Sequence, residues 1–127
     1  ITLRHTLEHF YDPAKVLSDL RNRLSKNGRI VIEVPDYGSY DRKKYGTKWP
    51  AFGPYHLWYF TQKSLNRILN DCGYEVIYFN KYISELVFGN GTLAHRGLRR
   101  AIYLLGGMHW FSGRSIGLIA KKSVPDV

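Results

Sequence analysis

Residues 28–35 have the sequence Gly28-Arg29-Ile30-Val31-Ile32-Glu33-Val34-Pro35. A short apolar run between a glycine and a proline predicts a strand. The run is apolar on both faces for most of its length, which is typical of strands in parallel sheets that helices cover. We therefore expect residues 29–34 to form a buried strand in an α/β fold.

A helix is predicted just before this strand. Asp12 can cap the free amide groups of a first turn, and Pro13 fits the first helical position because it has no N–H to lose there. Asn27-Gly28 is expected to end the helix in the left-handed conformation. The apolar residues share one stripe at helical spacing, namely Val16, Leu17, Leu20 and Leu24. A helix that leads through a short turn into a buried strand is half of a βαβ unit.

Further elements are predicted on both sides of this unit. Residues 1–4 are β-prone and predict the end of a strand. Thr61 can cap a second helix, and Gly73 is placed to stop it. Residues 75–80 and 115–122 predict two more strands. The order of strands and helices indicates an α/β domain.

Two long connections separate the predicted elements. Residues 35–60 show no period and are rich in Tyr, Trp and Phe, and a connection of that length and composition is usually functional. We expect it to be an aromatic loop on the substrate side of the domain. Residues 83–114 form a basic and aromatic insertion between the last two strands.

Composition limits the class of protein. The 127 residues fit one domain, and we treat residues 1–127 as a single partial domain because the sequence begins in the middle of a strand pattern. Cys72 is the only cysteine, which excludes an internal disulfide and a thiolate metal cluster. No stretch resembles a transmembrane helix or a signal peptide, so the cytoplasm is the expected compartment. The net charge of +9 permits anionic partners without identifying one.

Three segments form a combined motif. The first is Arg4-His5-Thr6-Leu7-Glu8-His9-Phe10-Tyr11-Asp12-Pro13. The second is residues 28–37, and the third is Gly53-Pro54-Tyr55-His56-Leu57-Trp58-Tyr59-Phe60-Thr61. Over residues 1–80 the pattern resembles the C-terminal half of the class I S-adenosylmethionine-dependent methyltransferases, in their ubiquinone-methyltransferase-like branch.

The resemblance implies a Rossmann-like α/β sheet with flanking helices. Its strands would resemble the family's fourth, fifth, seventh and sixth, with the seventh antiparallel, so residues 115–122 would lie between residues 29–34 and 75–80. S-adenosylmethionine is the implied cofactor. The family's glycine-rich turn and its ribose-binding acidic residue have no counterpart in this sequence. We therefore expect the chain alone to bind the cofactor weakly or not at all, and to be inactive.

Ligand sites in open α/β sheets lie beyond the carboxyl ends of the parallel strands. By the resemblance, His5, Thr6 and Glu8 would lie near the cofactor. For His5 the alternative is a histidine held by local hydrogen bonds. For Glu8 the alternative is a structural role in which the side chain bonds backbone amides.

His56 is the candidate general base, because a methyl acceptor must lose its proton to a group whose pKa lies near neutrality. The alternative is that His56 locks the aromatic loop onto the sheet. Tyr37, Trp49 and Tyr55 could wall a substrate pocket or favour a sulfonium through cation–π contacts, and packing is the alternative for each of them. No metal site is predicted.

These features favour a methyltransferase that acts on an oxygen, nitrogen or carbon of a small molecule. The competing hypothesis is a non-enzymatic basic α/β module that binds nucleic acid or a protein. Self-association is a further hypothesis, because the outer edge of the first strand would be unpaired. No nucleic-acid motif accompanies the basic residues, so nucleic acid is not the favoured partner. Residues 95–113 resemble an interfacial amphipathic segment, which indicates peripheral membrane contact as a minority hypothesis.

Overall fold

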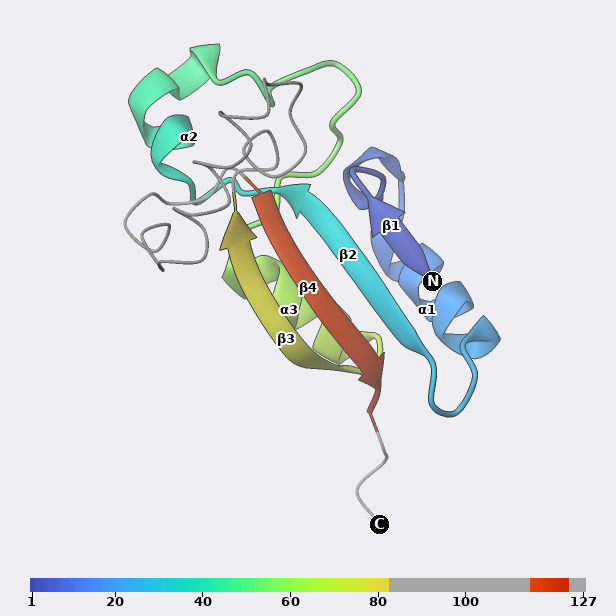
Figure 1. Ribbon diagram of the computed structural model, residues 1–127. Helices are drawn as coiled ribbons and strands as arrows, with labels where there is room; N and C mark the ends of the chain where they lie inside the picture. The colour runs from blue at the N-terminus through green and yellow to red at the C-terminus, as the bar shows by residue number, and fades with distance from the viewer. Residues whose placement is uncertain (83–114, 124–127) are drawn as a thin grey trace, which may run out of the picture.

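The computed structural model describes residues 1–82 and 115–123 (Figure 1). Its elements, in chain order, are β1 (Thr2–Arg4), the 3-10 helix η1 (Leu7–His9), α1 (Pro13–Arg23), β2 (Arg29–Pro35), α2 (Tyr40–Tyr45), the 3-10 helix η2 (Gly46–Lys48), α3 (Gln62–Asp71), β3 (Tyr74–Tyr82) and β4 (Ser115–Lys122). The basic and aromatic insertion expected at residues 83–114, with the amphipathic segment inside it, lies outside the described residues. Within the described part of the chain, no helix is long and apolar enough to cross a membrane.

The four strands form one sheet in the order β1-β2-β4-β3. β1 is parallel to β2, whereas β4 is antiparallel to both of its neighbours. The last strand in the sequence therefore lies between two earlier ones, as Figure 1 shows. This confirms the predicted order and the antiparallel direction of residues 115–122.

Helices α1 and α3 pack on the same face of the sheet (Figure 1). Alternate residues of the two central strands point to this face and are buried. One residue of α1 and two of α3 pack against them in the core, which other buried residues extend. These core residues are Ile30, Ile32, Val34, Ile116, Leu118, Ala120, Leu17, Leu65 and Leu69.

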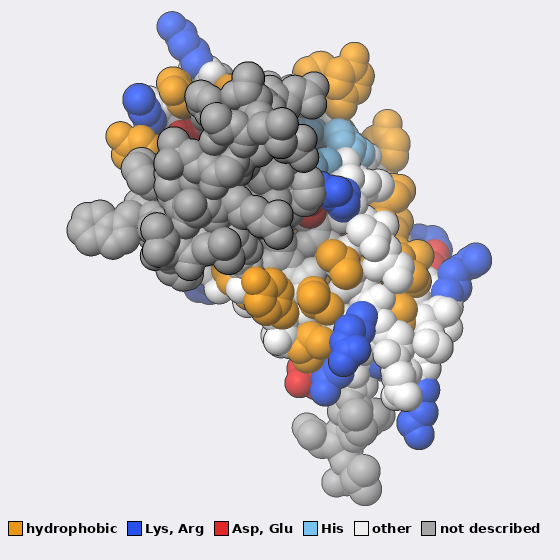
Figure 2. Space-filling model, viewed as in Figure 1, with side chains coloured by type: hydrophobic (Ala, Val, Ile, Leu, Met, Phe, Trp, Pro, Cys, Tyr) orange, Lys and Arg blue, Asp and Glu red, His pale blue; other side chains and the backbone are white. Residues whose placement is uncertain are grey.

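The opposite face of the sheet is less covered than the sequence predicts. The register aligns Val31 with Ile119, and Ile119 with Tyr78, in one row across three strands. Val31 is 37% exposed and Tyr78 is 52% exposed. Hydrophobic side chains therefore reach the surface on this face beside basic ones (Figure 2). The expectation that β2 is buried on both sides is wrong for the residues that the structure describes.

The start of α1 is as predicted, but its end is not. The carboxylate of Asp12 accepts the amide of Lys15 at 2.9 Å, and Pro13 occupies the first turn. The helix ends at Arg23, and Gly28 is not in the left-handed region. A Cβ at Gly28 would lie 2.8 Å from Cγ of Leu24, so close packing in the turn accounts for this glycine.

Both predicted ends of α3 are confirmed. Thr61 and Ser64 form a capping box, in which each side chain accepts the other's backbone amide. Gly73 has φ +74 just beyond the helix, a conformation that glycine adopts at little cost. The carbonyl of Gly73 also accepts a 2.8 Å hydrogen bond from Nε of Arg21, which ties α1 to the turn before β3.

Residues 35–60 are not a loop throughout, because they contain α2 and η2. Ser39 caps α2 by accepting the amide of Arg42 at 3.2 Å. The two ends of the segment are held together by a parallel bridge between Asp36 and Phe60. This closure places the segment over the carboxyl end of β2, beside η1.

Candidate functional site

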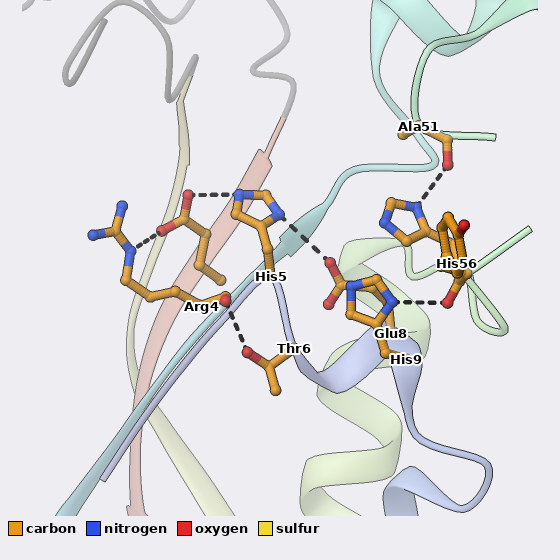
Figure 3. Close-up of polar contacts among 9 residues, drawn as sticks. Arg4, His5, Thr6, Glu8, His9, Ala51 and His56 are labelled. Atoms are coloured by element: carbon orange, nitrogen blue, oxygen red, sulfur yellow. Dashed lines mark hydrogen bonds and ion pairs between the residues drawn. The ribbon is translucent and has the colours of Figure 1, made fainter. Parts of the chain in front are cut away.

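The candidate site lies where the parallel strands β1 and β2 end. The chain leaves β1 at His5 and enters η1, which supplies Glu8 and His9. His56 comes from the segment before α3 and lies beside them (Figure 3). The carboxyl ends of parallel strands are where open α/β sheets bind ligands.

His5 is fixed between two carboxylates. Its backbone has φ +45, which turns the chain sharply after β1. Its Nε2 lies 3.0 Å from Glu33 Oε1, and its Nδ1 lies 3.5 Å from Glu8 Oε1. The pKa of His5 is raised, first by its contact with Glu8 and further by Glu33, although burial acts in the opposite direction. These acids favour the imidazolium form.

Glu8 is buried and poorly satisfied. It is 1% exposed, and neither carboxylate oxygen has a hydrogen-bond partner among the described residues. Its side chain therefore does not bond backbone amides, so the structural alternative for Glu8 is wrong in that form. Its backbone carbonyl accepts the amides of Leu57 at 2.9 Å and Trp58 at 3.2 Å. These bonds hold the segment around His56 against η1.

His9 and His56 face each other with their ring centroids 4.8 Å apart. Nδ1 of His9 lies 2.7 Å from the carbonyl of Tyr55, and Nδ1 of His56 lies 2.7 Å from the carbonyl of Ala51. A carbonyl can only accept, so each Nδ1 carries a proton, and Nε2 is the atom of each ring that can hold a free lone pair. One ligand atom from each of Glu8, His9 and His56 lies within 4.8 Å of the other two.

An aromatic cluster adjoins this group. Tyr37, Trp49, Phe52 and Tyr59 contact one another with ring centroids 5.1 to 6.3 Å apart. Trp49 is only 4% exposed, so most of its surface is used in packing. The ring of Tyr59 lies 6.4 Å from that of His56, which connects the cluster to the site.

Two predicted site residues have different surroundings. Tyr55 is 77% exposed and has no ring contact with the aromatic cluster in the described structure, and it contributes its backbone carbonyl to His9. The hydroxyl of Thr6 donates to the carbonyl of Arg4 at 2.8 Å, which stabilises the turn after β1. The role of Thr6 visible here is therefore local.

The structure brings together three of the predicted residues, His5, Glu8 and His56. Tyr37 and Trp49 lie in the adjoining aromatic cluster, whereas Tyr55 lies outside it. The sequence interpretation gave His9 no role. The available signal was that His9 directly follows Glu8 in the motif, but its approach to His56 depends on a contact between distant segments.

Comparisons with known proteins agree with this architecture. The family model described as a methyltransferase domain matches residues 1–78. A comparison with curated proteins found no match. Among solved structures, the chain is similar to the small RNA methyltransferase HEN1, with a TM-score of 0.57 and 14% identity over 99% of this chain and 14% of that protein.

Two further solved structures have the same fold. A SAM-dependent methyltransferase from Archaeoglobus fulgidus gives a TM-score of 0.55 at 22% identity, covering 95% of this chain and 57% of that one. The YcgJ protein from Bacillus subtilis gives 0.53 at 14% identity, covering 98% and 63%. The chain thus spans less than two thirds of the length of these proteins. Because the family model matches more than half of the chain and includes every residue of the candidate site, this protein belongs to the methyltransferase domain family.

Proposed function

We propose that this chain is the acceptor-side, C-terminal portion of a class I S-adenosylmethionine-dependent methyltransferase of the ubiquinone-methyltransferase-like branch. The observation that carries the proposal is the position of His5, Glu8 and His56 beyond the carboxyl ends of β1 and β2, inside the segment that the family model matches. This is the edge of an α/β sheet where ligands bind.

His56 is suited to accept a proton from the methyl acceptor. Its Nδ1 donates to Ala51, so the neutral ring presents a basic Nε2 toward the group that it forms with Glu8 and His9. Methyl transfer requires an acceptor with a free lone pair in line with the methyl–sulfur bond. A neutral imidazole at this position can remove the acceptor's proton as the new bond forms.

The aromatic cluster is proposed to line the acceptor side. Tyr37 is only partly buried, and its hydroxyl accepts a 3.0 Å hydrogen bond from Arg42, which fixes the ring. Trp49 supports this ring from the buried side. A small, partly apolar acceptor fits such a wall better than a large polar one.

Cofactor binding by the 127 residues alone is expected to be weak. His5, Thr6 and Glu8 would meet the cofactor, but the glycine-rich turn of the family has no counterpart in the sequence. We propose S-adenosylmethionine as the cofactor of the gene product that contains this chain, and no activity for the chain alone.

The test uses that gene product, with S-adenosylmethionine labelled in its methyl group. We expect calorimetry to show cofactor binding, and we expect label to enter a small-molecule extract rather than an RNA fraction. His56→Gln should lower the initial rate by about 10²-fold or more while leaving cofactor affinity unchanged, because it removes only a proton acceptor. Absence of cofactor binding would refute the proposal, and labelling of RNA alone would refute the acceptor class.

A further inference from the structure

Glu8 carries a buried carboxylate whose oxygens accept no hydrogen bond from residues 1–82 or 115–123. The residue is 1% exposed, and it forms an ion pair with Nδ1 of His5 at 3.5 Å, a distance beyond good hydrogen-bond length. His5 is also shared with Glu33, which lies closer to its other ring nitrogen. A buried carboxylate without hydrogen bonds is destabilising, and His5 supplies only part of the counter-charge because it is shared with Glu33. A second positive group beside Glu8, in addition to His5, would therefore stabilise the buried carboxylate.

The two imidazoles beside Glu8 are oriented as metal ligands are. Each donates its Nδ1 proton to a backbone carbonyl at 2.7 Å, from Tyr55 for His9 and from Ala51 for His56. Hydrogen bonds of this kind fix the tautomer and leave Nε2 as a donor atom for a metal. Figure 3 shows both rings on the side of Glu8 away from His5.

We propose that Glu8, His9 and His56 bind a divalent transition-metal ion of the zinc and cobalt type. One ligand atom from each residue already lies within 4.8 Å of the others. Ligands about 2.1 Å from Zn²⁺ in a tetrahedron lie about 3.4 Å apart, so binding needs the widest separation to shorten by up to about 1.4 Å. His9 is exposed and can supply this movement, whereas Glu8 is held by the packing around η1.

The donor set decides the class of ion. Two imidazoles and one carboxylate suit Zn²⁺ and Co²⁺, whereas Mg²⁺ and Ca²⁺ prefer oxygen ligands alone. Three protein ligands leave at least one coordination position open.

Nε2 of His56 has a single lone pair. A molecule in which this atom binds the metal ion therefore cannot at the same time use it as the base. The two proposals are separable. Metal binding is measured without methyl donor or acceptor, so its outcome does not depend on methyl transfer. His9→Gln removes a metal ligand and leaves the proposed base in place.

The test is a calorimetric titration of ZnCl₂ into chelator-treated protein, repeated with CoCl₂ and followed by visible absorption. We expect one ion per chain, with bound Co²⁺ giving the absorption bands of nitrogen and oxygen ligation. His9→Gln and Glu8→Gln should each weaken Zn²⁺ binding by at least about tenfold. MgCl₂ should not displace Zn²⁺.

Two controls test whether the ligand variants remain folded and whether other histidines bind the Zn²⁺. His9 is exposed, so His9→Gln should unfold at the same temperature as the wild type in the presence of chelator. A His95→Gln/His109→Gln protein removes two of the three histidines outside the group and keeps His5, and it should bind Zn²⁺ as the wild type does. The proposal is overturned if the wild type binds no Zn²⁺, if both ligand variants bind it with unchanged affinity, or if affinity is lost in the His95/His109 control instead.

Discussion

The buried phenol of Tyr74 makes the stability of the fold depend on pH. It is 2% exposed, and its hydroxyl donates to the carbonyl of Leu17 at 2.9 Å. Burial raises the pKa of Tyr74 from 10.0 to about 12, because the phenolate would lose its hydration in the core. In this pH range the folded state keeps a proton that the unfolded state releases, so folding becomes less favourable as the pH rises.

Tyr74→Phe should remove this alkaline sensitivity. The contribution of the phenol is fully present below pH 10.0 and is lost as the pH rises toward about 12. At neutral pH the variant should lose about 1 kcal/mol of unfolding free energy with its hydrogen bond. Urea unfolding of both proteins at neutral and alkaline pH measures the difference between them. A difference that stays constant up to the alkaline end of the series would contradict the assignment.

Single residues could be predicted where their role depends on nearby sequence. The capping of α1 by Asp12 and of α3 by Thr61 follows from rules that span three residues. Glu8 and His56 were identifiable as site candidates, but the lack of hydrogen bonds to the carboxylate of Glu8 within the described residues was not. It depends on the position of the segment around His56, almost fifty residues later in the chain. Rules that span a few residues do not predict that position.

At the scale of elements, an ion pair joins the end of β2 to β3. Asp36 is fully buried just after β2, and Nζ of Lys81 on β3 lies 2.7 Å from its Oδ2. The other oxygen accepts the amide of Gly38 at 2.8 Å. The pair anchors the start of the segment that carries the aromatic cluster. Its loss would leave a buried carboxylate with one hydrogen bond.

Lys81→Met should therefore destabilise the protein by about 3 kcal/mol, the usual cost of removing one partner of a buried pair. Lys121→Met is the matched control, because Lys121 pairs at 3.1 Å with Glu75, and the two side chains are 42% and 53% exposed. That change should cost no more than about 1 kcal/mol. Chemical denaturation compares the two variants, and Asp36→Asn added to Lys81→Met should recover part of the loss. Equal losses of unfolding free energy in the two lysine variants would contradict a stabilising role for the ion pair of buried Asp36 with Lys81.

Element boundaries were less predictable than element order. The end of α1 was expected at Asn27-Gly28, yet the helix ends at Arg23, because Leu24 turns into an extended conformation and packs in the core. The glycine that suggested a left-handed cap is required instead by steric contact with Leu24. The short helix α2 was not predicted, because its six residues are mostly polar and none of their side chains is buried.

At the scale of the whole molecule, the order of strands came from the resemblance to a family rather than from any pattern in the residues. Periodicity predicts that residues 115–122 form a strand, but it cannot place that strand between β2 and β3. The exposed row of Val31 and Tyr78 was not predicted either. The apolar composition of β2 indicates burial, whereas actual burial depends on what packs against each face.

The pairing of the strands predicts that local stability differs from one strand of the sheet to the next. β2 and β4 each pair on both sides, whereas β1 has three residues and pairs only with β2 within residues 1–82 and 115–123. Native-state hydrogen exchange should therefore show amides of β2 and β4 exchanging only on global unfolding, and those of β1 exchanging through local opening. If a second copy pairs with the outer edge of β1, protection of β1 should rise with protein concentration. Protection of β1 equal to that of β4 at every concentration would contradict both expectations.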